Sequence, residues 1–406
     1  VGYNISNEKF WQPIKPVISN LKIRGSWGLV GNDATNAGRF AYMEDLVLGG
    51  SDSYTTGIRQ DTYYSGPSWN RYFNPDLTWE VGEKINLGLD LQLFNDFNLT
   101  FDIFREKRRD IFMTRENSIP EIVGTGETKI TSNNGEMENK GLDLAIDYNK
   151  QITKDFFLSF KSTLTFARNK VLKMDEPPYF EYPGLSDVGH PLGTYWGYVA
   201  DGLFPDQETI DNSPRQDLGY TPQPGDIKYV NQPNAKGEYD NVINSNDRVA
   251  IGHPYDPELV YGFGPSMKWK NWDFSFFFQG VARTSFMMYG MHPFGTTSIK
   301  NMLQFVADDH WSVDNPNPNA AYPRLTKDSN GNNDQYSTYW LRNAAFLKLK
   351  NAEIGYTYKG MRFYLSGVNL LTFSPFKHWD PEMGGGNGLY YPTQRVFNIG
   401  FQMTIQ

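Results

Sequence analysis

The sequence predicts an all-β protein, an antiparallel transmembrane β-barrel to which this chain contributes about ten to twelve strands. Three observations favour this fold: segments that alternate apolar and polar residues, short turns alternating with long polar connections, and many aromatic residues. Successive side chains of a strand point to opposite faces, so strict alternation gives one apolar and one polar face. The segments recur at about the 9–11 residues that cross hydrocarbon as a tilted strand.

The carboxyl-terminal segment, residues 395–406, alternates most clearly. Its apolar positions are Phe397, Ile399, Phe401, Met403 and Ile405, and between them lie Val396, Asn398, Gly400, Gln402 and Thr404. A soluble β-sandwich would show the same alternation. The repetition at membrane-spanning length favours the barrel, in which the odd-numbered side chains contact lipid.

Earlier segments pair into hairpins around short turns. After a first strand at 20–31, we expect strands at 79–94 with 98–114, 140–151 with 156–171, 259–269 with 272–289, and 345–359 with 361–373. A short strand at 42–48 is a further candidate. Long loops are expected at about 32–78, 174–257, 290–340 and 374–392. The charged run 105–110 is costly in hydrocarbon and is expected above the membrane or in the lumen.

Composition narrows the class of protein. The 406 residues include 28 Phe, 25 Tyr, 10 Trp and no Cys, with a formal net charge of −8. The absence of Cys excludes disulfides and Cys-ligated metals, and the absence of a basic stripe argues against nucleic acid. No run approaches the roughly 18 apolar residues of a membrane helix. The low mean hydropathy suits a barrel, because only alternate strand residues face lipid. An aromatic-rich soluble β protein, such as a carbohydrate-binding sandwich, is the alternative.

Catalytic motifs are absent, so we do not expect an enzyme. The five histidines occur singly, without the HExxH spacing of zinc sites, and no G-x-S-x-G motif is present. Asp308 and Asp309 are adjacent, which would place them on opposite faces of a strand rather than as a glycosidase pair. The chain starts at Val1 without a signal peptide, so we expect it to be the later part of a longer, exported polypeptide.

Several motifs in order give the chain a family resemblance. They are NPDLTWEVGEKINLGLDLQLF (74–94), FREKRRDIFM (104–113), NKGLDLAIDY (139–148), YWGYVADGLF (195–204), PGDIKYV (224–230), the region 247–280, WLRNAAFLKLKNAEIGY (340–356), LSGVNLLTFS (365–374), DPE (380–382) and YPTQR (391–395). Together they resemble the barrel portion of the SusC/RagA family of TonB-dependent transporters of Bacteroidetes. The last residue, Gln406, departs from the aromatic residue with which that family usually ends.

The resemblance implies a twenty-two-stranded barrel in the bacterial outer membrane, with extracellular loops and an amino-terminal plug that this chain lacks. It implies import of oligosaccharides or peptides. The implied partners are a SusD-like surface lipoprotein over the mouth, outer-membrane lipids, the TonB–ExbB–ExbD complex acting through the missing amino-terminal part, and a dimer of transporter–lipoprotein pairs. The alternative is a self-standing outer-membrane or surface β protein that binds glycans without transport.

Aromatic and charged residues in the long loops are the candidate substrate-binding groups, because ring faces stack on sugars and carboxylates accept hydroxyl hydrogen bonds. They are Trp196, Tyr198, Asp201, Trp311, Trp340, Arg342, Trp379 and Asp380. Structural packing of an extracellular loop is the alternative for each of them. Contact with the lipoprotein lid is as strong a candidate as contact with substrate.

One loop is rich in oxygen ligands. Asp226, Asp240 and Asp247, with Asn244 and Asn246, are candidates for calcium, which prefers six to eight oxygens, and relatives often carry an Asp/Asn-rich loop here. The spacing departs from D-x-[DN]-x-[DN]-G, so a solvated turn is the alternative.

Overall fold

The computed structural model describes residues 1–34, 38–49, 53–115, 117–123, 130–290, 302–326 and 329–403. Among them, no helix has the length and apolar character needed to span a membrane. The two α-helices of this part of the chain are short, α1 (Gln207–Asp211) and α2 (Gln304–Asp308).

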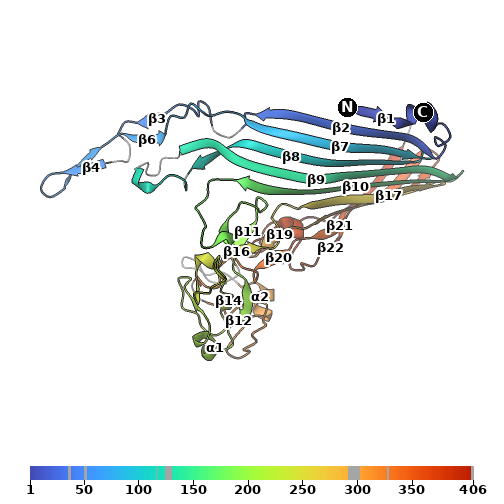
Figure 1. The fold of residues 1–406 in the computed structure, drawn as a ribbon. Coiled ribbons are helices and arrows are strands. Elements are labelled where there is room, and N and C mark those ends of the chain that lie inside the picture. The colour runs from blue at the N-terminus through green and yellow to red at the C-terminus, as the bar shows by residue number, and fades with distance from the viewer. Residues whose placement is uncertain are drawn as a thin grey trace.

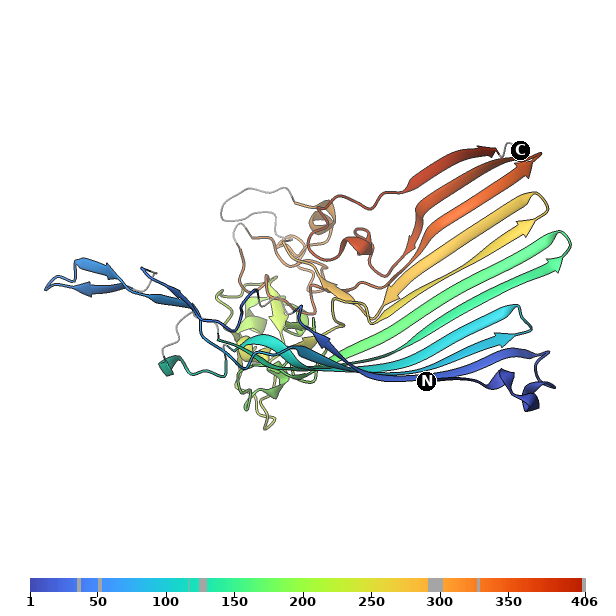
Figure 2. The same cartoon turned by 90° about the horizontal axis from the view of Figure 1, so that it is seen from above.

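Long strands form one curved antiparallel sheet (Figures 1 and 2). Within the described residues, the sheet has eleven strands in the order β1-β2-β7-β8-β9-β10-β17-β18-β21-β22-β23. Their bounds are β1 (Gly2–Asn4), β2 (Ile18–Asn32), β7 (Glu80–Leu93), β8 (Phe97–Arg115), β9 (Ile130–Thr153), β10 (Phe156–Lys173), β17 (Leu259–Trp269), β18 (Trp272–Ala282), β21 (Phe346–Tyr358), β22 (Met361–Phe373) and β23 (Val396–Met403).

This sheet confirms the all-β prediction, and each of the ten main predicted strands lies in it. β1 was not predicted, because three residues are too few to show a period. In two predicted strands, the observed pairing or length differs from the prediction. The segment 42–48 forms β3 (Asp45–Val47), which pairs with β6 (Ser68–Arg71) outside the large sheet. The segment 272–289 leaves the sheet after Ala282 and continues as β19 (Ser285–Met287). The predicted end at 404–406 lies outside the described residues.

Short turns join the strands at one end of the sheet, and the long connections lie at the other (Figure 2). Lys359 and Gly360, between β21 and β22, both have positive φ, 47° and 79°. Two central residues of positive φ are typical of a type I′ turn, whose twist matches that of the flanking strands. Tyr358 therefore pairs directly with Met361, which sets the register of this hairpin.

One face of the sheet, here called the outer face, is apolar and exposed. Its cross-strand rows include Phe274, Ile354, Leu365 and Ile399, each opposite the next. Ile399 is 88% exposed and Leu365 is 53% exposed. Near the short turns, a continuous aromatic row crosses six strands through Phe156, Trp269, Trp272, Tyr356, Phe363 and Phe401. Such a row matches the aromatic girdles expected at strand ends.

The opposite, inner face carries ion pairs across the strands. On β22, Arg362 binds Asp273 of β18 and Glu353 of β21. A second network joins Arg24 of β2 to two carboxylates of neighbouring strands, each at 2.9 Å, namely Asp90 and Asp102. The two faces of the sheet therefore differ in polarity, with these ion pairs on the inner face and exposed apolar side chains on the outer one.

The run 105–110 alternates between these faces. Glu106 lies opposite Lys84 and forms an ion pair with it at 3.5 Å on the inner face. Arg105 lies opposite Ile85, on the outer face. Asp110, with φ of 58°, occupies a bulge between β8 and β9. The inward residues of this run thus lie on the charged face, and the outward Arg105 lies one row beyond Ile103 and Leu142, so the run avoids the apolar rows, as predicted.

The remaining connections fold into a compact unit on the inner side of the sheet, at its long-loop end (Figure 1). This unit, the loop body, comprises the described residues of 174–258, 283–345 and 374–395. Its strands are β11 (Tyr195–Gly197) with β16 (Val249–Ile251), β12 (Ala200–Leu203) with β14 (Ile227–Tyr229), β13 (Arg215–Gln216) with β15 (Val242–Ile243), and β19 with β20 (Leu341–Asn343).

A second loop feature, the arm, extends beyond the end of the sheet (Figures 1 and 2). It consists of β3 with β6 and of β4 (Ser53–Thr56) with β5 (Thr62–Ser65).

Candidate functional site

The hydrophobic core of the described residues lies in the loop body, not in the sheet. It is built largely from aromatic and branched side chains of segments far apart in sequence, among them Tyr198, Ile227, Tyr229, Ile243, Phe286, Val306, Trp311, Tyr322, Trp340 and Phe376. Among the described residues, no second layer packs against the outer face of the large sheet, so its apolar side chains stay exposed while those of the loops are buried. The long loops therefore form a folded unit.

A buried carboxylate organises this unit. Asp226, fully buried, accepts hydrogen bonds from Arg324 Nε at 2.7 Å, from Asn330 Nδ2 at 3.0 Å and from Asn333 Nδ2 at 2.9 Å. It also accepts a hydrogen bond from the backbone N–H of Gln223 at 2.8 Å. A buried charge is tolerated only when it is paired and hydrogen-bonded, and this one is both. Asp226 therefore connects two loops about a hundred residues apart.

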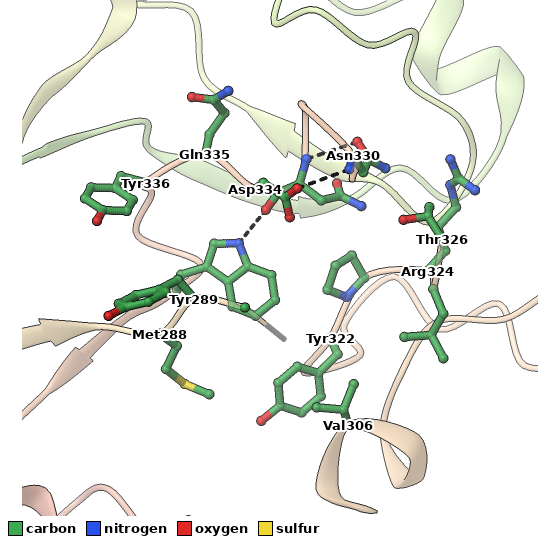
Figure 3. A pocket seen from close by; sticks show the side chains of 15 residues that line it. Met288, Tyr289, Val306, Tyr322, Arg324, Thr326, Asn330, Asp334, Gln335 and Tyr336 are labelled. Atoms are coloured by element: carbon green, nitrogen blue, oxygen red, sulfur yellow. Dashed lines mark hydrogen bonds between the residues drawn. The ribbon is translucent and has the colours of Figure 1, made fainter. Parts of the chain in front are cut away.

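Next to this network lies a cavity of about 200 Å³ (Figure 3). Its lining includes the aromatic rings of Tyr289, Tyr322, Tyr336 and Trp340 and the amide and carboxyl groups of Asn330, Asp334 and Gln335. Trp340 is fixed by donation from its Nε1 to the carbonyl of Asn333 at 2.6 Å. Tyr289 and Tyr336 are 53% and 48% exposed, so they border an opening. Rings with a few polar groups are typical of ligand sites, which usually measure roughly 300–1,000 Å³.

The loop that carries Trp379 and Asp380 is anchored to the sheet. Lys348 of β21, whose side chain is fully buried, reaches Asp380 at 2.6 Å and Glu382 at 2.5 Å. Lys350 binds Glu382 as well, at 2.8 Å. Burial raises the pKa of Glu382, but the hydrogen bonds from the two lysines outweigh it, so the pKa lies below its usual value.

Three predicted site residues lie close together in the chain of the loop body, on β11, on β12 and between these two strands. Tyr198 is 3% exposed and packs on Tyr229, with 5.1 Å between ring centroids. Trp196 is half-buried and donates from Nε1 to Asp187 at 2.6 Å. Asp201 is exposed and pairs with Lys228 at 2.8 Å. The packing alternative thus describes Tyr198 best, while Asp201 stays accessible.

The other predicted aromatic residues divide between core and cavity. Trp311, 6% exposed, packs closely over Gly225, where a Cβ atom would lie only 2.2 Å from the indole ring, and the φ of +89° also favours glycine there. Trp340 lines the cavity. Trp379 packs edge-on against Phe376, with 4.5 Å between the ring centroids. Contact of these residues with substrate stays a prediction.

Arg342 stands apart because it is a cation without a carboxylate. Its guanidinium donates to the carbonyls of Tyr339 at 2.6 Å and Leu341 at 3.1 Å, and within the described residues it forms no salt bridge. Burial lowers the pKa of Arg342, and burial followed by the charge of Arg342 lowers that of His378. Both residues line a shallow hollow. Arg342 is the only cation among the predicted site residues, and its charge is not neutralised by a carboxylate of the described chain. It could therefore bind an anionic group.

The three carboxylates predicted for calcium do not form one cluster, although Asp240 lies near enough to Asp247 to contribute to raising its pKa, after burial. Asp226 accepts from cationic and amide donors, Asp247 accepts from the backbone N–H groups of Gln232 and Asn244, each at 2.7 Å, and Asp240 is exposed. In the described ranges, no three His, Cys, Asp or Glu side chains gather closely enough to hold a metal. The carboxylates are acceptors for the chain's own donors, so they do not fit a calcium site.

Sequence reasoning missed Lys348, Glu382, Arg324, Tyr289 and Tyr336. Glu382 belongs to the DPE motif, and Lys348 is a charged residue in an otherwise apolar stretch, Phe346–Leu349. A lone lysine there was a usable signal. Tyr289 and Tyr336 gave no such signal, because nothing in their local sequence distinguishes them from the other tyrosines of the loops.

Comparison with known proteins agrees with this architecture. The family described as TonB dependent receptor-like, beta-barrel matches residues 20–370. TonB-dependent receptor P26 of Formosa agariphila is 28% identical over 439 residues, which covers 99% of this chain and 41% of that protein. TonB-dependent receptor SusC of Bacteroides thetaiotaomicron is 28% identical over 430 residues, covering 99% of this chain and 39% of that protein.

A solved structure of the RagAB peptide importer in its open-open state is similar in fold, with a TM-score of 0.74 and 21% identity. The similarity covers 100% of this chain and 42% of that one. The chain thus spans about two fifths of the length of the relatives it matches. The family resemblance indicated by the motifs is confirmed: the chain belongs to the TonB-dependent receptor-like β-barrel family.

Proposed function

We propose that this chain forms part of the barrel of an outer-membrane importer, energised through TonB, for oligosaccharides or peptides. The observation that carries the proposal is the contrast between the two faces of the large sheet. Exposed apolar rows such as Leu365–Ile399 suit lipid, and the ion pairs around Arg24 and Arg362 suit a water-filled lumen. Membership of the receptor family supports the same activity.

The loop body supports a role in holding substrate. It lies on the inner side of the sheet, at the end with long loops (Figure 1). In this proposal, that end is where a molecule entering from outside would first meet the barrel. Its cavity of about 200 Å³ is below the range of a complete small-molecule site. One sugar ring or one amino-acid side chain of a longer substrate would fit there. Tyr289 and Tyr336 would stack against it, and Gln335 would supply hydrogen bonds.

The arm supports a partner that covers the barrel mouth, a SusD-like surface lipoprotein. It exposes aromatic side chains well beyond the sheet, including Tyr54 at 58%, Tyr63 at 72% and Tyr64 at 48%. Tyr54 and Tyr64 stack at 5.3 Å between centroids, which gives the arm a preformed apolar surface. Aromatic residues are enriched in protein interfaces, and an exposed apolar cluster of this kind favours a partner.

Extraction and reconstitution test the transport proposal. The full-length protein that contains this chain is expected to require detergent and to insert into lipid vesicles, and mass spectrometry of the purified material should detect a bound glycan or peptide. A matched variant with Tyr289 and Tyr336 both replaced by Ala should lose that ligand and still insert. A monodisperse protein without detergent that binds glycans would instead support the self-standing binding protein.

A further inference from the structure

We propose that the outer face of β8, β9 and β10 holds a binding site for the phosphate groups of a lipid headgroup. The site lies where the apolar band ends, on the long-loop side of the sheet. The inference rests on the proposed membrane location and adds a specific ligand to it.

Three cations face one another across these strands. Arg105 of β8 lies directly opposite Lys140 of β9, and Lys140 lies directly opposite Arg168 of β10. Like charges directly opposite on one face of a sheet destabilise the pairing. A row of three cations is therefore unfavourable unless anions are present between them.

The height of this row is set by the register. The preceding outward row is fully apolar, Ile103 opposite Leu142 and Leu142 opposite Phe166. On β10, the aromatic row near the short turns begins at Phe156, and Phe156–Phe166 spans eleven residues. That length matches the 9–11 residues of a tilted strand across hydrocarbon. Arg168, the next outward residue, consequently lies at the level of the lipid headgroups.

The chain's own carboxylates only partly neutralise the row. Glu138 is shared between Arg105 at 2.6 Å and Lys140 at 2.7 Å. Glu258 is shared between Arg168 at 3.1 Å and Arg283 at 2.6 Å. Each of these carboxylates thus serves two cations.

Beyond the row, further outward cations outnumber their partners. Lys107 pairs with Glu136 at 3.0 Å, whereas Arg109 and Lys170 are exposed and form no ion pair within the described part of the chain. Glu83 lies opposite Lys107 on the same face and accepts a hydrogen bond from Trp27. Even with this carboxylate, the outer face at and beyond the row carries an excess of cations, although the whole chain has a formal net charge of −8. The side chains of the row itself remain accessible, with exposed fractions of 51%, 59% and 56% for Arg105, Lys140 and Arg168.

An aromatic residue completes the row on its far side. Trp27 of β2 lies opposite Ile85, and Ile85 lies opposite Arg105. Trp27 is 66% exposed on the outer face, and tryptophan is enriched at the membrane–water interface. A ligand at this place meets apolar side chains below and cations above.

This arrangement matches an amphipathic molecule rather than a free ion. Guanidinium and ammonium groups bind phosphate through charge-assisted hydrogen bonds, and the apolar row beneath contacts acyl chains. Clusters of basic residues beside membrane-spanning segments recognise anionic lipid headgroups in this way. A phosphorylated glycolipid or phospholipid has both parts.

Lipid binding to the full-length protein in detergent tests the inference, measured by native mass spectrometry with lipid A and with the same glycolipid after enzymatic removal of its phosphates. We expect phosphorylated lipid A to bind more tightly than the dephosphorylated form. The triple variant Arg105→Gln, Lys140→Gln and Arg168→Gln should weaken binding on the order of a hundredfold, since each cation near an anionic surface contributes about fivefold.

The matched control removes three lysines from the inner face of the same sheet, Lys84→Gln, Lys161→Gln and Lys268→Gln. Their inward positions follow from the register, and the control should bind lipid A like the unmodified protein. Inorganic phosphate should compete only weakly, because it lacks the apolar part. Equal binding of phosphorylated and dephosphorylated glycolipid, equal losses in both triple variants, or full competition by inorganic phosphate would each overturn the inference.

Insertion into vesicles of phosphatidylcholine, which carries no net charge, separates this inference from the proposed function. The unmodified protein and both variants are expected to insert, because insertion depends on the apolar rows. Failure of the unmodified protein to insert contradicts the membrane location. Normal insertion without discrimination between the two glycolipids overturns only the phosphate site.

Discussion

Lys348 of β21 and Glu382 of the loop before β23 form an ion pair of 2.5 Å in which the lysine side chain is fully buried. The pair joins the sheet to a loop thirty-four residues further along the chain, and Asp380 adds a second contact at 2.6 Å. The position of Trp379, next to Asp380, therefore depends on the buried positive charge of Lys348 in the sheet.

Replacement of Lys348 by Met should release this loop. Removal of one partner from a buried pair costs about 3–5 kcal/mol, because the remaining carboxylates lose their compensation. We expect a lower unfolding midpoint and faster hydrogen exchange at residues 374–392. Lys350→Met is the control, since its side chain is 25% exposed and a more solvated pair contributes about 1 kcal/mol or less. Equal exchange in the two variants would contradict the anchoring role.

The anchor should weaken in acid. Because the pKa of Glu382 is lowered in the folded protein, its stabilisation is complete above the ordinary glutamate value of 4.5 and is lost as the pH falls through the folded value. Hydrogen exchange at residues 380–384, corrected for the intrinsic pH dependence, should therefore accelerate below about pH 4.5. Glu382→Gln should remove much of this dependence. An unchanged profile in that variant would assign the effect to another group.

Asp226→Asn should destabilise the loop body by about 3 kcal/mol or more. The substitution removes a buried charge and leaves Arg324 unpaired, and it introduces an amide donor among existing donors. Thermal unfolding measures the loss, and limited proteolysis of the loop body locates it. Asp240→Asn, at an exposed position, should change stability by less than about 0.5 kcal/mol.

Calcium should not stabilise the loop body. The oxygens of Asp226 and Asp247 accept hydrogen bonds from Arg324 and from backbone N–H groups, which leaves a cation poorly matched there. We expect the same unfolding temperature with calcium and with a chelator. A calcium-dependent increase that disappears in Asp247→Asn would contradict this expectation and restore the metal site predicted from the sequence.

Ile399→Arg should destabilise the membrane-inserted protein, and Asn398→Arg should not. The two residues are neighbours on β23 and point to opposite faces, and Ile399 is 88% exposed on the outer one. Arginine on the lipid face of a barrel costs roughly 2–4 kcal/mol at mid-depth. Denaturant titration of vesicle-inserted protein compares the variants. Equal stability of both would argue that the outer face contacts water or protein.

Local sequence was enough to predict the strands of the large sheet, because the alternation of apolar and polar residues involves only neighbouring positions and recurs every two residues along a strand. The segments around Ile399 and Leu365 show this. The segment 42–48 has strand-forming residues too, yet its pairing with β6 depended on where the intervening turn brought the chain back.

The packing of the long loops, by contrast, depended on tertiary structure. Asp226 and Arg324 are ninety-eight residues apart, and nothing in their local sequence indicates that they meet. The same holds for Tyr198 and Trp311, whose burial results from packing between distant segments. The sequence by itself determined which residues form strands and which face of each strand is apolar. Only the tertiary structure decided which loop residues form the core, the anchor or the cavity lining. Those roles arise from contacts between residues far apart in sequence, which a local pattern cannot predict.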